Sequence, residues 1–362
     1  MNHEVPGGSQ SRVESVPSAP VRIPSLDGLR GLLLLLVLQA HLAMSHFLPP
    51  WLRASPLGFA ALTCFFVISG YLITRQLMKE QDKHGSVSLK SFYIKRAFRI
   101  FPVFLVYALS LLALRAAGVV HVSNYEFFRA STFTMNYLDP PHRILEHLWS
   151  LSVEEQFYLI WPLLLVALTR RKAIYVCAAV VILCPMFRAL AWDLNVNRTL
   201  IPRRFELIAD CLAFGCLLAL CEASLRRSTL FRRVITDLGA SLACCAMLAT
   251  VLIERFRPET MIVGRTIVSC GAAIVIMWLM NNPDRGFGIL VNHPIPVFLG
   301  QISYSVYMWQ QLFCMPTPGE PILLRFPANI VATFLVGIPT YLLVETKMIA
   351  VGRQVAFRFK SR

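Results

Sequence analysis

Arg30 and His41 stand eleven positions apart in one apolar stretch, "LRGLLLLLVLQAH". At ~100° per residue this spacing is close to three full helical turns, so both side chains project from one helix face, ~16 Å apart along the axis. A guanidinium binds anions, and an imidazole exchanges protons near neutral pH. The pair predicts an anion site and a proton-transfer site at two depths, with a snorkelling arginine and a hydrogen-bonded structural histidine as the alternative.

Two adjacent carboxylates, Glu154 and Glu155, lie in "HLWSLSVEEQFYLIWP". They lie about two turns into a predicted span that enters the membrane from the outer side. This count predicts that they lie at a membrane depth close to that of His41. A carboxylate beside a histidine can orient the ring and stabilise its charged form. We therefore expect Glu154 to support His41.

Two further stretches carry candidate binding residues. In "FYIKRAFRIFP", Arg96 and Arg99 are one helical turn apart, a spacing that suits phosphate, although spacing alone favours membrane anchoring. In "CFFVISGYLITRQL", the small pair Ser69-Gly70 allows another helix or a ligand to approach closely. Helix packing is the simpler reading of that pair, and a nucleophilic Ser69 is weakly supported.

Other polar residues in apolar stretches predict hydrogen bonds between helices. They are Asp210, Ser303, Tyr304, Ser305, Tyr307 and Glu345.

These residues belong to a chain whose composition indicates a membrane protein. Its 362 residues are 56% hydrophobic and only 15% charged, and the mean hydropathy is +0.59. Runs of ~20 apolar residues are long enough to cross a bilayer as helices. We predict an all-α, polytopic membrane bundle of about ten transmembrane helices, at 26–46, 56–78, 98–120, 147–169, 172–192, 205–223, 235–254, 261–281, 296–315 and 328–349.

Charge distribution predicts the orientation of the bundle. Lys and Arg accumulate in alternate connections, at 79–99, 170–172 and 226–233, and again near the C-terminus, which places both termini in the cytoplasm. Residues 1–22 read as a disordered cytoplasmic tail, 23–350 as the transmembrane domain and 351–362 as a basic cytoplasmic tail. The net charge of +15 then faces an anionic leaflet, and no motif supports nucleic-acid binding. Most of the ten cysteines lie in apolar spans without CxxC spacing, so no metal is expected.

Taken together, the motifs resemble the acyltransferase-3 family of integral membrane acyltransferases. The resemblance runs in order through "LDGLRG" and His41, "FFVISGYLIT", "KRAFRIFP", "HLWSLSVEEQFYLIWP", "ADCLAFGCLLA", "LGQISYSVYMWQ" and "YLLVE". Two departures are visible. Lys95 stands where the family often has a first arginine, and Gln310 and Gln311 follow the tyrosines where the family often has a histidine.

The resemblance implies an O-acyltransferase, commonly an O-acetyltransferase, in the bacterial inner membrane. It would move an acyl group from cytoplasmic acyl-CoA to a hydroxyl of a carbohydrate such as a lipopolysaccharide, another surface polysaccharide or a glycolipid. By their match to family motifs, His41, Glu154 and Arg30 are the expected catalytic residues. Arg96, Arg99 and Arg30, joined by Ser69, are expected to bind the donor. Some members add an extracytoplasmic SGNH domain, and we expect this chain to act without one.

Two mechanisms and one rival function stay open on these residues. His41 could act as general base on the acceptor hydroxyl with Glu154 orienting it, or form a transient acyl-histidine. The rival is a secondary transporter or flippase that uses the intramembrane His, Glu and Arg as a proton relay. No internal repeat and no matched pair of broken spans supports that rival.

Overall fold

The computed structural model describes residues 22–44, 57–138, 143–314 and 325–359, and within these ranges the regular secondary structure is entirely helical. The first half contains α1 (Pro24–Met44), α3 (Leu57–His84), α4 (Leu89–Ala116), α5 (Asn124–Ser131), η1 (Met135–Tyr137), α6 (Arg143–Glu146), α7 (Leu148–Ala167) and α8 (Arg170–Asp193). The second half contains α9 (Phe205–Arg227), α10 (Thr229–Val234), α11 (Asp237–Phe256), η2 (Pro258–Thr260), α12 (Met261–Asn281), α13 (Phe287–Asn292), α14 (Pro294–Gln301), α15 (Ser303–Cys314), α16 (Ala328–Thr340), η4 (Tyr341–Glu345) and α17 (Thr346–Phe357).

The predicted all-α membrane bundle is confirmed, and the protein is a multi-pass integral membrane protein. Eight helical stretches in the described residues are long and apolar enough to span a membrane, compared with about ten predicted. The fourth predicted span, α7, is not among the eight, because its consecutive Glu154, Glu155 and Gln156 lower its hydropathy. The ninth predicted span is also not among them, because it is divided at Ile302 into the short helices α14 and α15.

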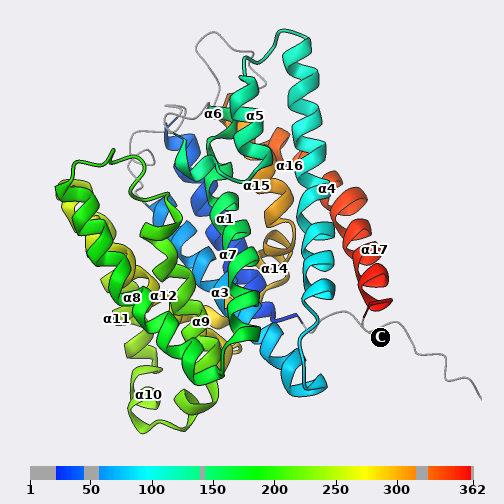
Figure 1. The fold of residues 1–362 in the computed structure, drawn as a ribbon. Coiled ribbons are helices and arrows are strands. Elements are labelled where there is room, and N and C mark those ends of the chain that lie inside the picture. The colour runs from blue at the N-terminus through cyan, green and yellow to red at the C-terminus, as the bar shows by residue number, and fades with distance from the viewer. Residues whose placement is uncertain (1–21, 45–56, 139–142, 315–324, 360–362) are drawn as a thin grey trace, which may run out of the picture.

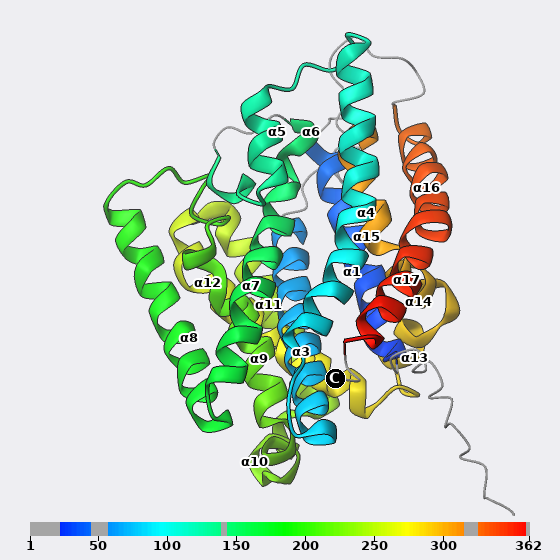
Figure 2. The ribbon, with the colours of Figure 1, turned by 45° about the vertical axis from the view of Figure 1, so that its right-hand side comes forward.

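One end of the bundle gathers cationic residues from separate segments of the chain. The α3–α4 connection and the end of α17 lie at one end, and α5 and α6 lie at the other (Figures 1 and 2). The first end, here called the basic end, carries Arg22, Lys79, Lys83 and Arg353. In the predicted orientation the basic end is cytoplasmic. The proposed N-terminal tail, 1–22, lies outside the described residues except for Arg22, and α17 continues across the proposed boundary at 350.

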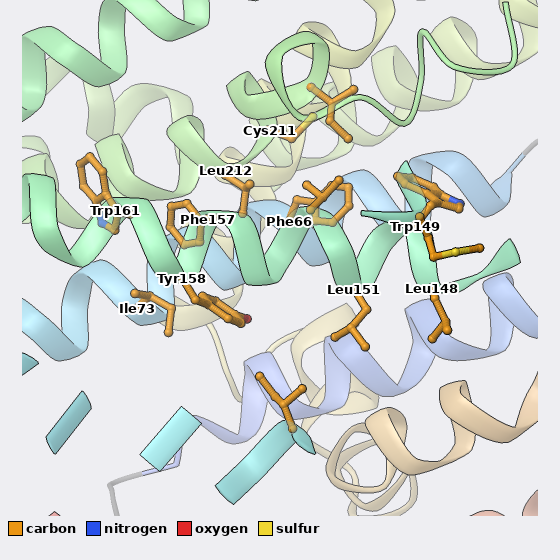
Figure 3. Packing of buried hydrophobic residues seen from close by; sticks show 14 of the residues in the cluster. Phe66, Ile73, Leu148, Trp149, Leu151, Phe157, Tyr158, Trp161, Cys211 and Leu212 are labelled. Atoms are coloured by element: carbon orange, nitrogen blue, oxygen red, sulfur yellow. The ribbon is translucent and has the colours of Figure 1, made fainter. Parts of the chain in front are cut away.

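Helix α7 packs one face against α3 and α9. Figure 3 shows its aromatic side chains lying along the ribbon, with Phe66 of α3 and Leu212 of α9 directed toward them. The rings of Phe66 and Trp149 meet edge to face at 6.1 Å, and the indole of Trp161 donates to Thr74 Oγ1 at 2.8 Å. This packing fixes the depth and rotation of α7, and with them the position of Glu154.

Helices α3 and α9 approach one another through glycines. A Cβ on Gly70 would overlap the carbonyl oxygen of Leu212, and a Cβ on Gly215 would overlap that of Val67. Small residues permit this backbone contact in membrane helices. Because Ser69 is the neighbour of Gly70, the contact also sets where the Ser69 hydroxyl lies.

We expect Gly70→Ala to separate α3 from α9, since its Cβ meets main-chain atoms that have no rotamer to change. Overpacking of this kind costs about 1–3 kcal/mol, measurable as a lower unfolding temperature in detergent, and should also lower activity by moving Ser69. Gly264→Ala is the matched control, because its Cβ would meet the methyl group of Thr250 at 2.9 Å, far from Ser69 in sequence. Equal stability of the two variants would contradict the prediction.

A buried ion pair braces the helices farther from α1. Arg188 on α8 donates to both carboxylate oxygens of Asp210 on α9, at 2.9 and 2.8 Å, and to Thr266 on α12 at 2.7 Å. Thr266 also donates to Asp210 at 2.7 Å. Both charged side chains have no exposed surface. The expectation that Asp210 bonds between helices is therefore confirmed, and its role is to hold three helices together.

Candidate active site

Five of the six predicted site residues line a series of three cavities that begins at the basic end, and they are Arg30, Ser69, Arg96, Arg99 and Glu154. His41 lines none of the three. The largest, about 540 Å³, is called the basic cavity. Its lining includes seven cationic side chains and two carboxylates: Arg22, Arg30, Arg75, Lys79, Arg96, Arg99 and Arg353, with Asp27 and Glu345. Only Arg75 among these cations has a carboxylate within 4 Å in the described part of the chain, namely Glu222 at 3.7 Å. The excess positive charge favours an anionic ligand.

Two smaller cavities of about 70 Å³ each continue inward from the basic cavity. The first inner cavity is lined by Arg96, Arg99 and Ser69. The second inner cavity is lined by Tyr307, Ser150 and Phe66. Both are also lined by Arg30, Glu154 and Tyr304. Arg30 therefore borders all three spaces, and its Nε is buried without a hydrogen-bond partner.

The predicted arginine pair faces the cavities from α4. Arg96 and Arg99 both line the basic cavity and the first inner cavity. The guanidinium of Arg96 lies over the rings of Tyr158 and Phe92, at 4.9 and 5.6 Å from their centroids. These aromatic contacts orient Arg96 without neutralising it, which leaves its N–H groups for an anion.

Glu154 is held by two hydroxyls. Ser69 donates to its Oε1 at 2.7 Å and Tyr158 donates to its Oε2 at 3.1 Å. The sequence prediction that Glu154 lies at the depth of His41 and orients it is wrong. His147, just before α7, is within electrostatic range of His41, and Glu154 is seven residues further along, ~10 Å deeper. The carboxylate consequently lies beside Arg30, at the level of the inner cavities.

The partner of His41 is Gln310 on α15. The Nδ1 of His41 lies 3.1 Å from Gln310 Oε1, and the Gln310 side chain is fully buried. An amide oxygen accepts hydrogen bonds, so Nδ1 donates in this contact and the Nε2 lone pair is left for chemistry. Gln310 thus makes the contact with His41 that the sequence assigned to Glu154.

One turn before Gln310 on α15, Tyr307 contacts a second histidine, His147. The hydroxyl of Tyr307 donates to the main-chain oxygen of His147 at 2.8 Å and lies 2.6 Å from Ser150 Oγ. The His147 ring packs edge to face on Tyr307 and Tyr107. Tyr307 therefore connects the wall of the second inner cavity to the region of the two histidines.

The remaining polar motif residues fix the helices around these cavities. Tyr304 donates to the carbonyl of Ile100 at 2.9 Å, and Ser305 donates to Glu345 Oε2 at 2.6 Å. Glu345 closes the π-helical turn η4, a local widening that often marks functional sites. The expectation of interhelical hydrogen bonds is confirmed for Tyr304, Ser305 and Glu345.

Sequence reasoning missed several residues of this region. The cations Arg22, Arg75, Lys79 and Arg353 of the basic cavity could be read as ordinary interfacial charges, and only their convergence from three separate segments distinguishes them. His147 stands in the same motif as Glu154 and Glu155, and nothing in its spacing singles it out. Gln310 is visible in the sequence only as a departure from the family pattern, and the absence of a histidine there is the one signal that could point to it.

Comparisons with known proteins agree with this architecture. The family model described as "Acyltransferase domain" matches residues 23–344. Peptidoglycan O-acetyltransferase OatA of Listeria monocytogenes is 30% identical over 355 residues, covering 90% of this chain and 55% of the relative. Putative peptidoglycan O-acetyltransferase YrhL of Bacillus subtilis is 27% identical over 373 residues, covering 94% and 56%. A putative O-acetyltransferase of Staphylococcus aureus (strain COL) is 28% identical over 312 residues, covering 79% and 50%.

The chain thus spans about half the length of these curated relatives. No solved structure matches it. Because the family model covers nearly all of the helical bundle, including every residue of the inner cavities, the chain belongs to the acyltransferase-3 family of membrane acyltransferases.

Proposed function

We propose that the protein is a membrane O-acetyltransferase that takes its acyl group from acyl-CoA and delivers it to a hydroxyl of a carbohydrate. The names of its relatives support the acetyl group and a peptidoglycan-type acceptor, since OatA and YrhL are named for that reaction. The observation that carries the proposal is the basic cavity, which continues through Arg30 into spaces beside Glu154 and Tyr307.

The residues of the basic cavity fit the charged half of acyl-CoA. The diphosphate carries two negative charges, and guanidinium groups bind phosphate oxygens in pairs. Arg96 and Arg99 project from adjacent turns of α4, and the buried Nε of Arg30 has no partner of its own. We assign these three arginines to the diphosphate.

The distance from this arginine group to His41 suits the rest of the donor. About 13 bonds join the diphosphate of CoA to its sulfur, a chain that extends to ~15 Å at the ~3.5 Å per three bonds of an extended backbone. Arg30 and His41 are ~16 Å apart along α1. A donor anchored at the arginines would therefore bring its thioester to the level of His41.

At that level we propose that His41 acts as general base. Its Nε2 takes the proton of the acceptor hydroxyl while the hydroxyl oxygen bonds to the thioester carbonyl carbon. The carbon–sulfur bond then breaks with its electron pair on sulfur, and the imidazolium returns the proton to give free CoA thiol. Gln310 holds the ring through Nδ1, while Glu154 and Arg30 set the charge of the space below.

The direct test uses protein reconstituted in lipid nanodiscs with acetyl-CoA and a soluble peptidoglycan fragment. We expect release of CoA thiol together with an acetyl ester on the fragment, identified by mass spectrometry. Thiol release without an ester would contradict the acceptor assignment. Absence of both, with counterflow of a glycolipid in liposomes lacking acyl-CoA, would favour the transporter.

The pairing of His41 with Gln310 predicts a shift in the pH dependence of the reaction. Gln310→Glu places a carboxylate against Nδ1, which stabilises the imidazolium and raises the pKa of His41. Since a general base must be unprotonated, the acidic limb of the rate–pH profile should move to higher pH. Gln311→Glu serves as the control, because no hydrogen bond joins Gln311 to His41 in the described structure. An unchanged profile in Gln310→Glu would remove Gln310 from the orienting role.

A further inference from the structure

Apart from Arg75, which pairs with Glu222, the cations of the basic cavity fall into two groups. Arg30, Arg96 and Arg99 line both the basic cavity and the first inner cavity, whereas Arg22, Lys79 and Arg353 line the basic cavity alone. The second group comes from three separate segments, just before α1, near the end of α3 and near the end of α17. We call Arg22, Lys79 and Arg353 the mouth cations.

The mouth cations lack close counter-ions in the described ranges. No carboxylate lies within 4 Å of any of them, although Asp27 and Glu345 share the cavity. Arg22 and Arg353 are within electrostatic range of one another and therefore repel. Like charges gathered in a concave surface create a potential that an anion would relieve.

The geometry of the proposed donor says which anion this is. If the diphosphate lies at Arg30, Arg96 and Arg99, the pantetheine arm runs inward to His41, and the adenosine must extend outward toward the mouth. The ribose of that adenosine carries a 3′-phosphate monoester with a charge of about −1.5 to −2 near pH 7. It is the only other phosphate in CoA.

Building on the proposed donor, we propose that the mouth cations form a binding subsite for the 3′-phosphate of CoA. The protein would then select CoA over 3′-dephospho-CoA, which has the same thioester arm and diphosphate. Arg353 and Lys79 project from helices on separate segments, so they can contact the monoester from two directions. Arg75, in contrast, is engaged with Glu222 at 3.7 Å and is left out of the subsite.

The test is equilibrium binding of CoA and of 3′-dephospho-CoA to the purified protein in non-ionic detergent. Charge-assisted hydrogen bonds to a phosphate monoester predict that CoA binds at least about tenfold more tightly. In Lys79→Gln and Arg353→Gln this preference should shrink severalfold, with little change in affinity for dephospho-CoA. Each change removes one exposed or half-buried charge, so folding should be unaffected and can be checked by size-exclusion chromatography.

Two matched controls separate a subsite from general attraction. The control variants are Lys83→Gln and Arg358→Gln. Lys83 lies one turn beyond Lys79 and Arg358 lies beyond Arg353, yet neither Lys83 nor Arg358 lines the basic cavity. Both control variants should keep the full preference for CoA. Equal losses in the control and mouth variants, or an equal loss of both ligands in a mouth variant, would overturn the subsite.

The outcomes distinguish the subsite from the proposed function. Equal binding of CoA and dephospho-CoA by the wild-type protein would overturn the subsite and leave the donor assignment standing. Binding of neither would overturn the donor assignment and the subsite with it. Repeating the measurement in nanodiscs containing phosphatidylglycerol tests the other phosphate source: if the lipid abolishes the preference for CoA, the mouth binds headgroups and the proposal is wrong.

Discussion

Replacing His41 with alanine should reduce acyl transfer by about 10²–10⁴-fold, the usual contribution of a positioned general base. The physical reason is that His41 supplies an imidazole held in one orientation near the end of α1, where Gln310 Oε1 lies 3.1 Å from its Nδ1. The described structure places no other imidazole in that position. Arg30 lies ~16 Å from His41 along α1, and Arg96 and Arg99 are on another helix, α4, so affinity for CoA should be preserved. Acetyl ester formation and CoA binding, measured on the same preparation, check both statements.

His147→Ala is the matched control for His41→Ala, since it removes the other imidazole of the same region. Its ring packs between Tyr107 and Tyr307 and makes no hydrogen bond in the described structure. We expect His147→Ala to lower stability through lost packing and to retain much more activity than His41→Ala. Near-normal transfer by His41→Ala would eliminate His41 as the base, and a covalent acetyl group trapped on wild-type His41 would favour the acyl-histidine route.

The second large effect concerns stability. Asp210→Ala leaves the guanidinium of Arg188 without its carboxylate in a site with no exposed surface. Removing one partner of a buried ion pair costs about 3–5 kcal/mol, because the remaining charge is desolvated and uncompensated. The variant should unfold at markedly lower temperature or denaturant concentration in detergent micelles.

The reverse substitution distinguishes loss of the pair from loss of the charge. In the double variant Arg188→Met with Asp210→Leu, no charge is left uncompensated, so most of the lost stability should return. Glu259→Ala is the control at an exposed pair, that of Arg257 and Glu259, and should change stability too little to detect. If Asp210→Ala were as stable as the wild-type protein, α8, α9 and α12 would not depend on this brace.

The helical architecture and the general place of the site could be predicted from local sequence. Apolar length alone indicates membrane helices, and the eleven-residue spacing of Arg30 and His41 places them on one face whatever surrounds the helix. Both outcomes follow from properties of a single segment. The same holds for Arg96 and Arg99, which are one turn apart on α4 and face the same cavities.

What failed depended on how segments meet. The depth of Glu154 follows from where α7 begins relative to α1, and that level is set by packing against α3 and α9 rather than by residue counts. Arg188 could not be matched to Asp210 from sequence, because 22 positions and a turn separate them. The division of the ninth span at Ile302 likewise could not be predicted, because no proline or glycine lies at the break itself. The nearest such residue is Gly300, two positions earlier.

One consequence follows from the position of Arg30, whose side chain borders the basic cavity and both inner cavities. Because a single guanidinium forms part of three walls, a ligand that moves Arg30 in one space would link its own binding to occupancy of the other two. An anion that draws Arg30 toward the mouth removes positive charge from the neighbourhood of Glu154, and a ligand at Glu154 must alter affinity at the mouth by the same factor. Donor and acceptor would therefore sense one another before any bond between them forms.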